Sequence, residues 1–345
     1  MFTKLLKFSK HLQSSILKSK IDISALVEGI LKGDRVRLGR AITLIESTKP
    51  AHQEMAQQII EKCLPHSGDS IRLGVTGTPG VGKSTFIESL GSFLVEKGDK
   101  VAVLAIDPSS QVSRGSILGD KTRMEKLSNH PSAFIRPSPA GKTLGGVARK
   151  TRETIILCEA AGFNKIFVET VGVGQSEVAV HLMVDFFLLL LLPGAGDELQ
   201  GIKRGIVEMA DGVVINKSED ERIELAKKAK RSYKNALHLF PLKKSGCSPD
   251  VILASGLHGT GIESVWEMIA SYETFTKKNH YFKKRRNEQA GYWLSETIKT
   301  GLESSFFKNE KIKTALEQVK QEVLESKRSP FEAAEFLLKL FTEVD

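Results

Sequence analysis

Short apolar runs rich in β-branched residues alternate with amphipathic helical stretches between Asp69 and Ser271. The runs are "IRLGVTG", "VAVLAID", "KIFVET", "FFLLLLL", "GVVINK" and "DVILAS". Such alternation is typical of βαβ units, whose parallel strands are buried on both faces. The longest run, Phe186–Leu192, is too short to cross a bilayer and suits a buried strand. The pattern predicts an α/β fold with a mostly parallel sheet flanked by helices, and no membrane span.

Both ends of the chain have a helical pattern instead. Apolar positions recur at helical spacing from Ser24 to Leu64, with Pro50 at a helix start. "SPFE" at 329–332 is a capping box with Pro330 in the first helical position. A stripe recurs every fourth residue: Ala290, Leu294, Ile298, Leu302 and Phe306. It suits an oligomer interface or packing on the chain's own domain. We expect helical extensions over 1–67 and 281–345 around an α/β domain over 68–280.

Composition adds little about partners. The 345 residues carry a net charge of +9, with Lys and Arg spread among Asp and Glu. Nucleic-acid binding needs basic residues clustered on one face, so we expect no nucleic-acid partner. Cys63, Cys158 and Cys247 are far apart and predict free thiols in a reducing compartment, without a zinc site.

The first twenty residues contain five lysines and no acid. They suit a mitochondrial transit peptide or the basic first helix of a bacterial protein. The absence of arginine favours the helix, and with it a cytoplasmic protein rather than one of the mitochondrial matrix.

The stretch "GVTGTPGVGKST" matches G-x-x-x-x-G-K-[ST] at every fixed position, between a predicted strand and an amphipathic helix. Glycines let the backbone amides face phosphate oxygens, and the helix start adds positive charge. Lys83 is expected to reach the β- and γ-phosphates and Ser84 to bind Mg²⁺. A chance glycine turn would lack the flanking strand and helix. The predicted phosphate loop comprises Gly77, Thr78, Pro79, Gly80, Val81, Gly82, Lys83, Ser84 and Thr85.

Two acids follow predicted strands. Asp107 closes "VAVLAID" and Glu169 closes "KIFVET". Ligands bind at the carboxyl edge of such sheets, so both acids fall where a metal–phosphate complex would lie. An acid at a strand end is otherwise commonly a helix cap. Two of them in a chain with a phosphate loop favour metal-linked roles.

Four longer stretches resemble the conserved blocks of the MeaB/ArgK family: "AIDPSSQVSRGSILGDKTRME", "FIRPSPAGKTLGG", "VETVGVGQSEVAV" and "LLPGAGDELQGIKRGIVEMAD". The resemblance runs from about Ser24 to Phe341. These P-loop GTPases accompany adenosylcobalamin-dependent acyl-CoA mutases. It implies GTP as substrate, Mg²⁺, a mutase partner such as methylmalonyl-CoA mutase whose cofactor delivery and protection are gated, and a homodimer formed through the C-terminal helices.

The resemblance also implies roles for residues around the γ-phosphate. Ser84, Asp107, Asp120 and Glu169 are the implied ligands of Mg²⁺ and its waters. Arg123 is implied to stabilise charge on the transferred phosphate, and Glu169 with Gly172 to sense the γ-phosphate. In "GAGDELQGIKR", Gln200 and Lys203 are candidates for coupling partner contact to hydrolysis. Thr170 and Val171 follow Glu169, and no obvious water-orienting glutamine stands there, so we expect slow intrinsic hydrolysis.

The stretch "GVVINKSED" is the expected strand into a base-reading loop, with Asn216 and Lys217 in place. The family pattern has an Asp that accepts hydrogen bonds from guanine N1–H and the 2-amino group, whereas here that position holds Glu219. Either Glu219 reads the base through a small loop shift, or Asp220 swings in.

The later "ASGLHG" stands where the family often has Ser-Ala, and its candidates for contacting the base are Ser255, Gly256 and Leu257. We expect GTP to be preferred over ATP, with selectivity sensitive to these departures.

Three other roles share the same nucleotide site. One is an accessory ATPase or kinase of basic amino-acid transport. Another is a metal-insertion GTPase, although the eight histidines are scattered and His181 suits core packing. The third is a scaffold that binds nucleotide without hydrolysing it.

Overall fold

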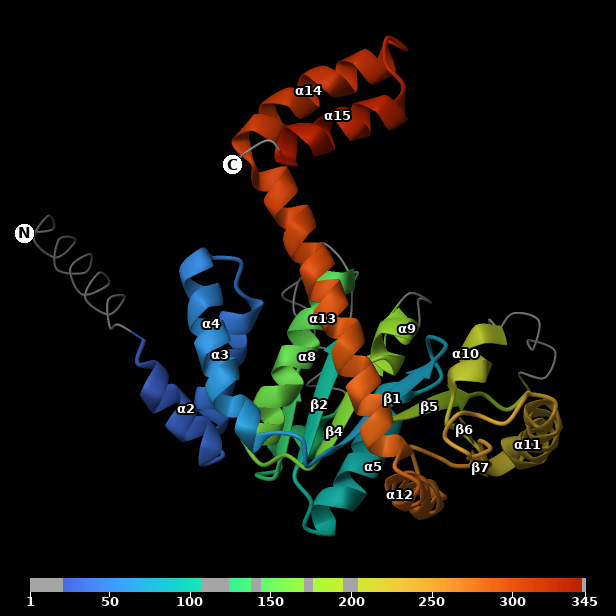
Figure 1. The fold of residues 1–345 in the computed structure, drawn as a ribbon. Helices are drawn as coiled ribbons and strands as arrows, with labels where there is room; N and C mark the ends of the chain where they lie inside the picture. Colours follow the sequence, from blue (N-terminus) through green and yellow to red (C-terminus); the bar gives the residue numbers. More distant parts are fainter. Residues whose placement is uncertain (1–20, 107–123, 138–143, 171–175, 195–203, 343–345) are drawn as a thin grey trace, which may run out of the picture. The chain divides into compact units, whose positions relative to one another are not determined.

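In the computed structural model, which describes residues 21–106, 124–137, 144–170, 176–194 and 204–342, seven strands form one all-parallel sheet (Figure 1). The strand order is β3-β2-β4-β1-β5-β6-β7. The strands are β1 (Ile71–Gly77), β2 (Val101–Ile106), β3 (Ala133–Arg136), β4 (Lys165–Thr170), β5 (Phe186–Leu191), β6 (Gly212–Ile215) and β7 (Val251–Leu253). The predicted α/β fold with a parallel sheet is confirmed.

Strand β3 is absent from the six predicted strands. It pairs only with β2, at the edge of the sheet. Ala133 is its only fully buried residue, and the other three are half-buried. The strand is only four residues long, "AFIR", and ends in the charged Arg136, so its sequence lacks the longer apolar run by which the others were recognised.

Strand β5 shows why those central runs are apolar throughout. Its side chains alternate between two hydrophobic clusters on opposite faces of the sheet. Leu188 and Leu190 pack in the cluster with helices α5 (Lys83–Glu96) and α12 (Ile262–Lys278). Leu189 and Leu191 pack in the cluster with α10 (Arg204–Met209) and α11 (Ile223–His238). Every position of the strand is therefore removed from water.

Three N-terminal helices, α2 (Ile23–Leu31), α3 (Arg35–Glu46) and α4 (Pro50–Cys63), pack on one another and on α8 (Leu144–Ala160). A 3₁₀ turn over Leu64–His66 follows α4. Glu46 ties α3 to the rest of this unit because it pairs with Arg136 and its carbonyl accepts from Lys150 Nζ. Helix α4 begins at Pro50 as expected. The chain also forms two short helices, α7 (Glu125–Asn129) and α9 (Ser176–His181), and a 3₁₀ turn at Asp220–Arg222.

A buried ion pair joins the central strand to α8. Arg72 Nε and Nη2 donate to the two carboxylate oxygens of Glu159 at 2.9 and 3.0 Å. Ser70 Oγ and the Gly68 amide also donate to this carboxylate, at 2.5 and 2.9 Å. The Glu159 side chain is 1% exposed and that of Arg72 is 11% exposed. The bidentate geometry and the added donors offset the cost of burying both charges.

The chain divides into two compact units after Lys283. The second unit comprises most of α13 (Tyr281–Lys308), α14 (Glu310–Leu324) and α15 (Pro330–Thr342). Its small core contains Val319, Ala333 and Leu337. The predicted start of α15 is confirmed, because the Glu332 amide donates to Ser329 Oγ at 3.1 Å.

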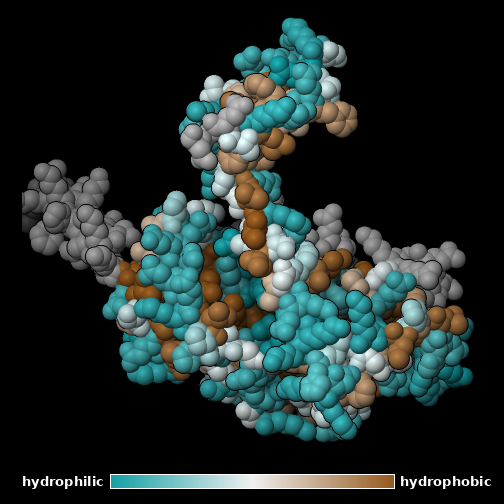
Figure 2. Space-filling model, viewed as in Figure 1, coloured by the Kyte–Doolittle hydropathy of each residue, from teal (hydrophilic) through white to brown (hydrophobic). Residues whose placement is uncertain are grey.

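Helix α13 carries an exposed apolar stripe. Leu294, Ile298 and Leu302 are 64%, 52% and 61% exposed, and Figure 2 shows a brown line of hydrophobic residues along this helix. Phe306, the last residue of the predicted stripe, instead packs against the core of the second unit. Nowhere in the described ranges is a helix both long and apolar enough to span a bilayer.

Candidate nucleotide-binding site

The phosphate loop connects β1, which ends at Gly77, to α5, which begins at Lys83. Three glycines of the loop, Gly77, Gly80 and Gly82, have positive φ, and at two of them a Cβ would also meet close neighbours. Gly77 has φ +152°, and a Cβ there would lie 2.5 Å from the Leu190 carbonyl oxygen of β5. Gly82 has φ +93°, and a Cβ there would lie 2.9 Å from Asn216 Nδ2. Left-handed backbone and close neighbours both exclude a side chain, so the loop stays open toward the carboxyl edge of the sheet.

Lys83 lies inside this loop. Its Nζ donates to the carbonyl oxygens of Gly77 and Thr78 at 2.8 and 3.3 Å. Burial lowers the pKa of its ammonium group, while the negative charges of Glu169 and Glu177 act in the opposite direction. A triphosphate would supply the negative charge that this partly buried cation lacks.

Ser84 and Glu169 meet at the end of β4, where Ser84 Oγ donates to Glu169 Oε1 at 3.0 Å. A hydroxyl and a carboxylate oxygen at this spacing are the donor types that Mg²⁺ prefers. These two residues therefore fit the ion that the sequence predicts. The other expected Mg²⁺ residues, Asp107 and Asp120, lie outside the described residues.

Asn216 holds the phosphate loop against the base-reading loops. Its Nδ2 donates to the Val81 carbonyl oxygen at 2.8 Å, and its Oδ1 accepts from the Gly256 amide at 3.0 Å. Lys217 has φ +57° and donates from Nζ to the Gly80 carbonyl oxygen at 2.9 Å. One Asn-Lys pair thus connects three loops, which makes the phosphate and base regions a single site.

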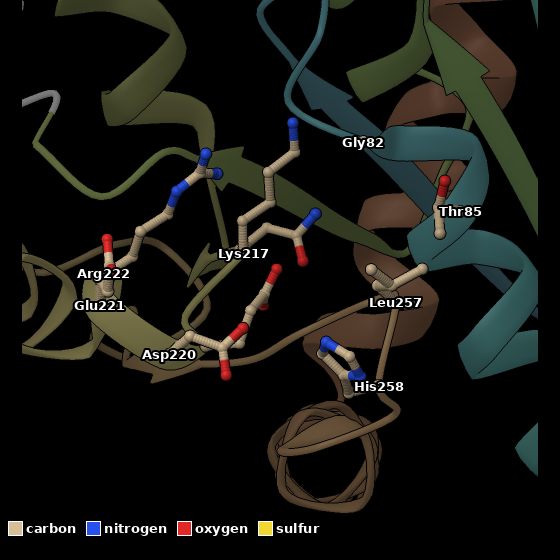
Figure 3. Close-up of a pocket in the computed structure, with 10 residues that line it drawn as sticks. Gly82, Thr85, Lys217, Asp220, Glu221, Arg222, Leu257 and His258 are labelled. Carbon is tan, nitrogen blue, oxygen red and sulfur yellow. The ribbon is translucent and has the colours of Figure 1, made fainter.

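A pocket of about 630 Å³ adjoins the phosphate loop. It is lined by Gly82, Thr85, Asn216, Lys217, Glu219, Asp220, Glu221, Arg222, Leu257 and His258. Figure 3 shows Lys217 extending toward the phosphate loop and Leu257 lying beside the start of α5 at Thr85. Leu257 is 72% exposed, so its side chain is available to cover a flat ring.

Among the residues that line this pocket, Glu219 has a side-chain oxygen that could accept a hydrogen bond from a ligand. Its Oε2 is buried and has no hydrogen-bond partner in the described structure. The neighbouring Asp220 is exposed, has φ +50° and starts the 3₁₀ turn. Burying a carboxylate oxygen without a donor is costly, so a ligand with N–H groups fits here. Of the two acids that the sequence left open, Glu219 has the better geometry.

The loop after β7 explains Gly256. A Cβ at this position would lie 2.9 Å from Phe86 Cα and 3.0 Å from Phe86 N on α5. The alanine that the family pattern has there would need a backbone shift in this chain. Ser255 is fully buried, and its Oγ accepts from the His258 amide at 3.1 Å. The Ser255-Gly256 pair therefore shapes this side of the base pocket.

The structure brings the phosphate loop, Glu169, Asn216, Lys217, Glu219 and the Ser255–Leu257 loop together. Several other predicted residues lie outside the described ranges: Asp107, Asp120, Arg123, Gly172, Gln200 and Lys203.

Sequence reasoning missed four residues of this site. Glu177, 1% exposed on α9, acts electrostatically on Lys83, whereas Glu221, Arg222 and His258 line the pocket. Glu177 belongs to the family-like block "VETVGVGQSEVAV", but no local signal in the sequence marks the other three.

His181 packs against an aromatic residue of β5. Its ring stacks edge-on against Phe187 with centroids 5.6 Å apart. In the part of the chain that the structure describes, no group of three or more His, Cys, Asp or Glu side chains is placed to hold a metal ion.

Comparisons with known proteins agree with this geometry. Residues 38–311 match the family model of the methylmalonyl-CoA mutase-associated GTPase MeaB. The chain is 47% identical to a putative GTPase of Caulobacter vibrioides, over 93% of this chain and 98% of that protein. It is 42% identical to the mitochondrial methylmalonic aciduria type A homolog of Mus musculus, over 96% and 82% of the two chains. A crystal structure of a LAO/AO transport system kinase is 34% identical, has a TM-score of 0.73 and covers 94% of this chain and 100% of its own.

Proposed function

Since the chain belongs to the MeaB family of methylmalonyl-CoA mutase-associated GTPases, we propose that it is the GTP-hydrolysing accessory protein of an adenosylcobalamin-dependent acyl-CoA mutase. Methylmalonyl-CoA mutase is the first candidate, because the family model carries its name. In this role the protein gates delivery of the mutase's cofactor and protects it. That it is a GTPase follows from the family and from its relatives.

The buried oxygen of Glu219 carries the choice of nucleotide. Guanine presents N1–H and a 2-amino group side by side, and the two oxygens of a carboxylate accept from both. Adenine offers no such pair of donors. Glu219 lines a pocket that also borders Gly82 and Thr85 of the phosphate loop, and its buried Oε2 has no hydrogen-bond partner among the described residues. Guanine in this pocket would satisfy it and would place the phosphates at the start of α5.

Hydrolysis then depends on charge and position. Water attacks the γ-phosphorus, the bond to the β-γ bridging oxygen breaks, and GDP and phosphate leave. Lys83 gives up its contacts with the carbonyl oxygens of Gly77 and Thr78 and pairs with the β- and γ-phosphate oxygens. Amides of the phosphate loop and the start of α5 face the same oxygens. Charge that develops on the transferred group is thereby stabilised without any covalent intermediate.

Mg²⁺ fits beside these groups. Ser84 and Glu169 would hold it, directly or through water, and it would neutralise charge on the β- and γ-phosphates.

Slow hydrolysis by the protein alone is part of the proposal. No obvious water-orienting glutamine follows Glu169, where Thr170 and Val171 stand. Mutase binding is expected to raise kcat. Through this coupling, whether GTP or GDP is bound would depend on whether the mutase is bound.

Phosphate release is the direct test. The purified chain is assayed with GTP and with ATP, each with and without methylmalonyl-CoA mutase. We expect hydrolysis of GTP in preference to ATP, and a higher kcat for GTP when the mutase is added. Equal rates of GTP and ATP hydrolysis would contradict the proposed preference for guanine. A kcat for GTP that the mutase leaves unchanged would contradict the proposed coupling.

We also propose a homodimer through the C-terminal helices. The exposed Leu294, Ile298 and Leu302 stripe on α13 supports it, because an apolar row of this length is costly in water. Changing all three to Gln should yield a monomer by light scattering, with helical content by circular dichroism preserved. A dimer that survives these changes would place the interface elsewhere.

A transport-linked kinase remains the second candidate, because the solved relative is described as a LAO/AO transport system kinase. Transfer of labelled γ-phosphate to a substrate-binding protein would support it, whereas release of all the label as free phosphate supports the GTPase.

We propose the cytoplasm as the compartment. The mouse relative is described as mitochondrial, and the candidate transit peptide of this chain, residues 1–20, lies outside the described ranges.

A further inference from the structure

One segment of the first unit carries most of the net charge of the chain. Residues 225–249 contain seven Lys and Arg and no Asp or Glu, whereas the whole chain has a net charge of +9. The rest of the chain is therefore close to balance, and the basic residues are less evenly spread than composition suggests. This segment comprises α11 from its third residue onward and the loop that leads to β7.

Four of the six basic residues of α11 lie on one line along the helix. Lys227, Arg231, Lys234 and His238 are spaced by four, three and four residues, which places them on one face. All four are exposed. At 1.5 Å per residue the line is about 16 Å long. The buried face of the helix is formed by Ala226, Ala229, Tyr233 and Leu237. We call the exposed line the α11 stripe.

Nearby carboxylates neutralise only part of the α11 stripe. Lys227 pairs with Glu224 at 2.7 Å, and Lys234 Nζ lies 3.9 Å from Asp250. Arg231 takes part in no ion pair within the described ranges. Exposed pairs of this kind are weak and readily exchanged for other partners. The stripe therefore presents a positive field to solvent.

The C-terminal end of α11 opens into a groove of about 530 Å³. Val207 of α10 and Leu237, Phe240 and Pro241 line its apolar part. At its rim Leu239 is 86% exposed. Figure 1 shows α10 and α11 at the same end of the sheet, near β6. The α11 stripe and the groove thus form one surface with a charged part and an apolar part.

Lys243 fixes the loop that forms this groove. Its Nζ donates to the Met209 carbonyl oxygen at 2.9 Å and to Asp211 Oδ1 at 3.1 Å. It also donates to the Ala210 carbonyl oxygen at 2.5 Å. Lys243 holds the loop against the end of α10, so the groove is built before any partner arrives.

We propose that the α11 stripe and this groove are the docking surface for an acidic segment of the mutase that also carries apolar side chains. The proposal rests on the proposed partnership with the mutase. The segment's carboxylates pair with Lys227, Arg231 and Lys234, and its apolar side chains enter the groove beside Leu239 and Leu242. Charge steers the encounter, and burial of the apolar side chains retains the complex.

A protein fits this surface better than a nucleic acid does. Phosphate backbones would use the lysines but would leave the groove and the exposed leucines in water. A protein segment uses both parts, as interfaces with an apolar core and a charged rim do.

The test measures binding of the full chain to methylmalonyl-CoA mutase by titration calorimetry, at low and at physiological ionic strength. The stripe variant is Lys227→Glu/Arg231→Glu/Lys234→Glu. We expect it to bind at least tenfold more weakly than the wild type, with most of the salt dependence lost. Leu242→Asp, at a position 70% exposed, should also weaken binding severalfold.

Matched controls separate these effects from net charge and from folding. Lys62→Glu/Lys97→Glu/Lys126→Glu makes the same change in net charge at exposed positions of the same unit. Leu64→Asp matches Leu242→Asp, at a leucine that is 54% exposed. Both controls should bind the mutase within twofold of the wild type. Thermal melting and GTP hydrolysis without mutase should be unchanged in all four variants.

The outcomes distinguish this proposal from the function on which it rests. If the wild type binds the mutase and the stripe variant binds equally well, the docking surface is wrong and the proposed function stands. If the wild type does not bind the mutase, both are wrong. The stripe variant could instead bind the mutase as tightly as the wild type and bind duplex DNA or a second copy of the chain more weakly. The surface would then have that other occupant, and the proposal would be overturned.

Discussion

Replacing Glu219 by Gln tests the base pocket most sharply. The substitution keeps the length of the side chain and replaces one carboxylate oxygen by an NH₂ group. Glu219 Oε2 is buried and has no hydrogen-bond partner in the described structure. If guanine supplies its donors, the variant loses a charge-assisted hydrogen bond worth about 1.5–3 kcal/mol. At 1.4 kcal/mol per tenfold, GDP should bind about 10- to 150-fold more weakly.

The same change should act in the opposite direction on two other measurements. Xanthine carries a carbonyl oxygen where guanine has its 2-amino group, so the side-chain amide of the Glu219→Gln variant can donate to it. XDP should therefore gain affinity relative to GDP. Without nucleotide, the variant no longer buries a charged oxygen that has no donor, a cost of about 1–3 kcal/mol. Its melting temperature without nucleotide should not fall.

The assays are calorimetric titration with GDP, XDP and ADP, and thermal melting with and without each nucleotide. Glu96→Gln, at an exposed position at the end of α5 and outside the pocket, is the matched control and should bind GDP as the wild type does. Asp220→Asn tests the neighbouring acid. A Glu219→Gln variant that binds GDP within twofold of the wild type and shows no shift toward XDP would refute the reasoning. The same effects in Asp220→Asn instead would identify Asp220 as the reader.

Four further predictions concern Lys83, Glu159 and Asn216. Lys83→Ala should lower kcat for phosphate release from GTP by about 10²–10³-fold, with circular dichroism unchanged, because it removes a cation aimed at the transferred group. Burial lowers the pKa of Lys83 below 10.5, and bound phosphates would raise it again, so wild-type GDP affinity should fall as pH rises through the lowered pKa; a flat profile would count against this role. Glu159→Ala leaves Arg72 as a buried cation and should lower the free energy of unfolding by about 3–5 kcal/mol in urea, whereas a loss under 1 kcal/mol would show that the pair is not structural. Asn216→Ala leaves the Gly256 amide without its side-chain acceptor and should weaken GDP binding and lower the free energy of unfolding by about 1–3 kcal/mol; an unchanged GDP affinity would mean that the three loops hold their positions without it.

Predictions from local pattern succeeded where a local physical rule applied. The strands buried on both faces had continuous apolar runs, so the parallel sheet was predictable. Pro50 and Ser329 marked helix starts for local reasons. The fixed φ of proline suits the first helical position, and the serine hydroxyl accepts a hydrogen bond from an amide of the first turn. Strand β3 was missed because its four residues, "AFIR", end in a charged side chain and form too short an apolar run to stand out.

The residues of the site likewise fall into those that the sequence predicted and those that needed the structure. The phosphate loop is a continuous motif whose glycines and lysine follow from backbone chemistry, so its position was readable from the chain alone. Gly256 was not explicable from sequence, since its reason is the backbone of Phe86, which approaches only after α5 packs beside the loop. The choice between Glu219 and Asp220 likewise needed the burial of one carboxylate oxygen and the exposure of its neighbour.

The sequence by itself determined the α/β architecture, the phosphate loop and the family, because each depends on residues that are close together in the chain or on blocks that match in order. Tertiary structure alone showed that Glu219 has a buried carboxylate oxygen while Asp220 is exposed, and how Asn216 joins three loops. It also decided that a basic helix face and an apolar groove form one surface. Those features depend on distances between segments far apart in sequence, and such distances exist only after the sheet has brought the segments together.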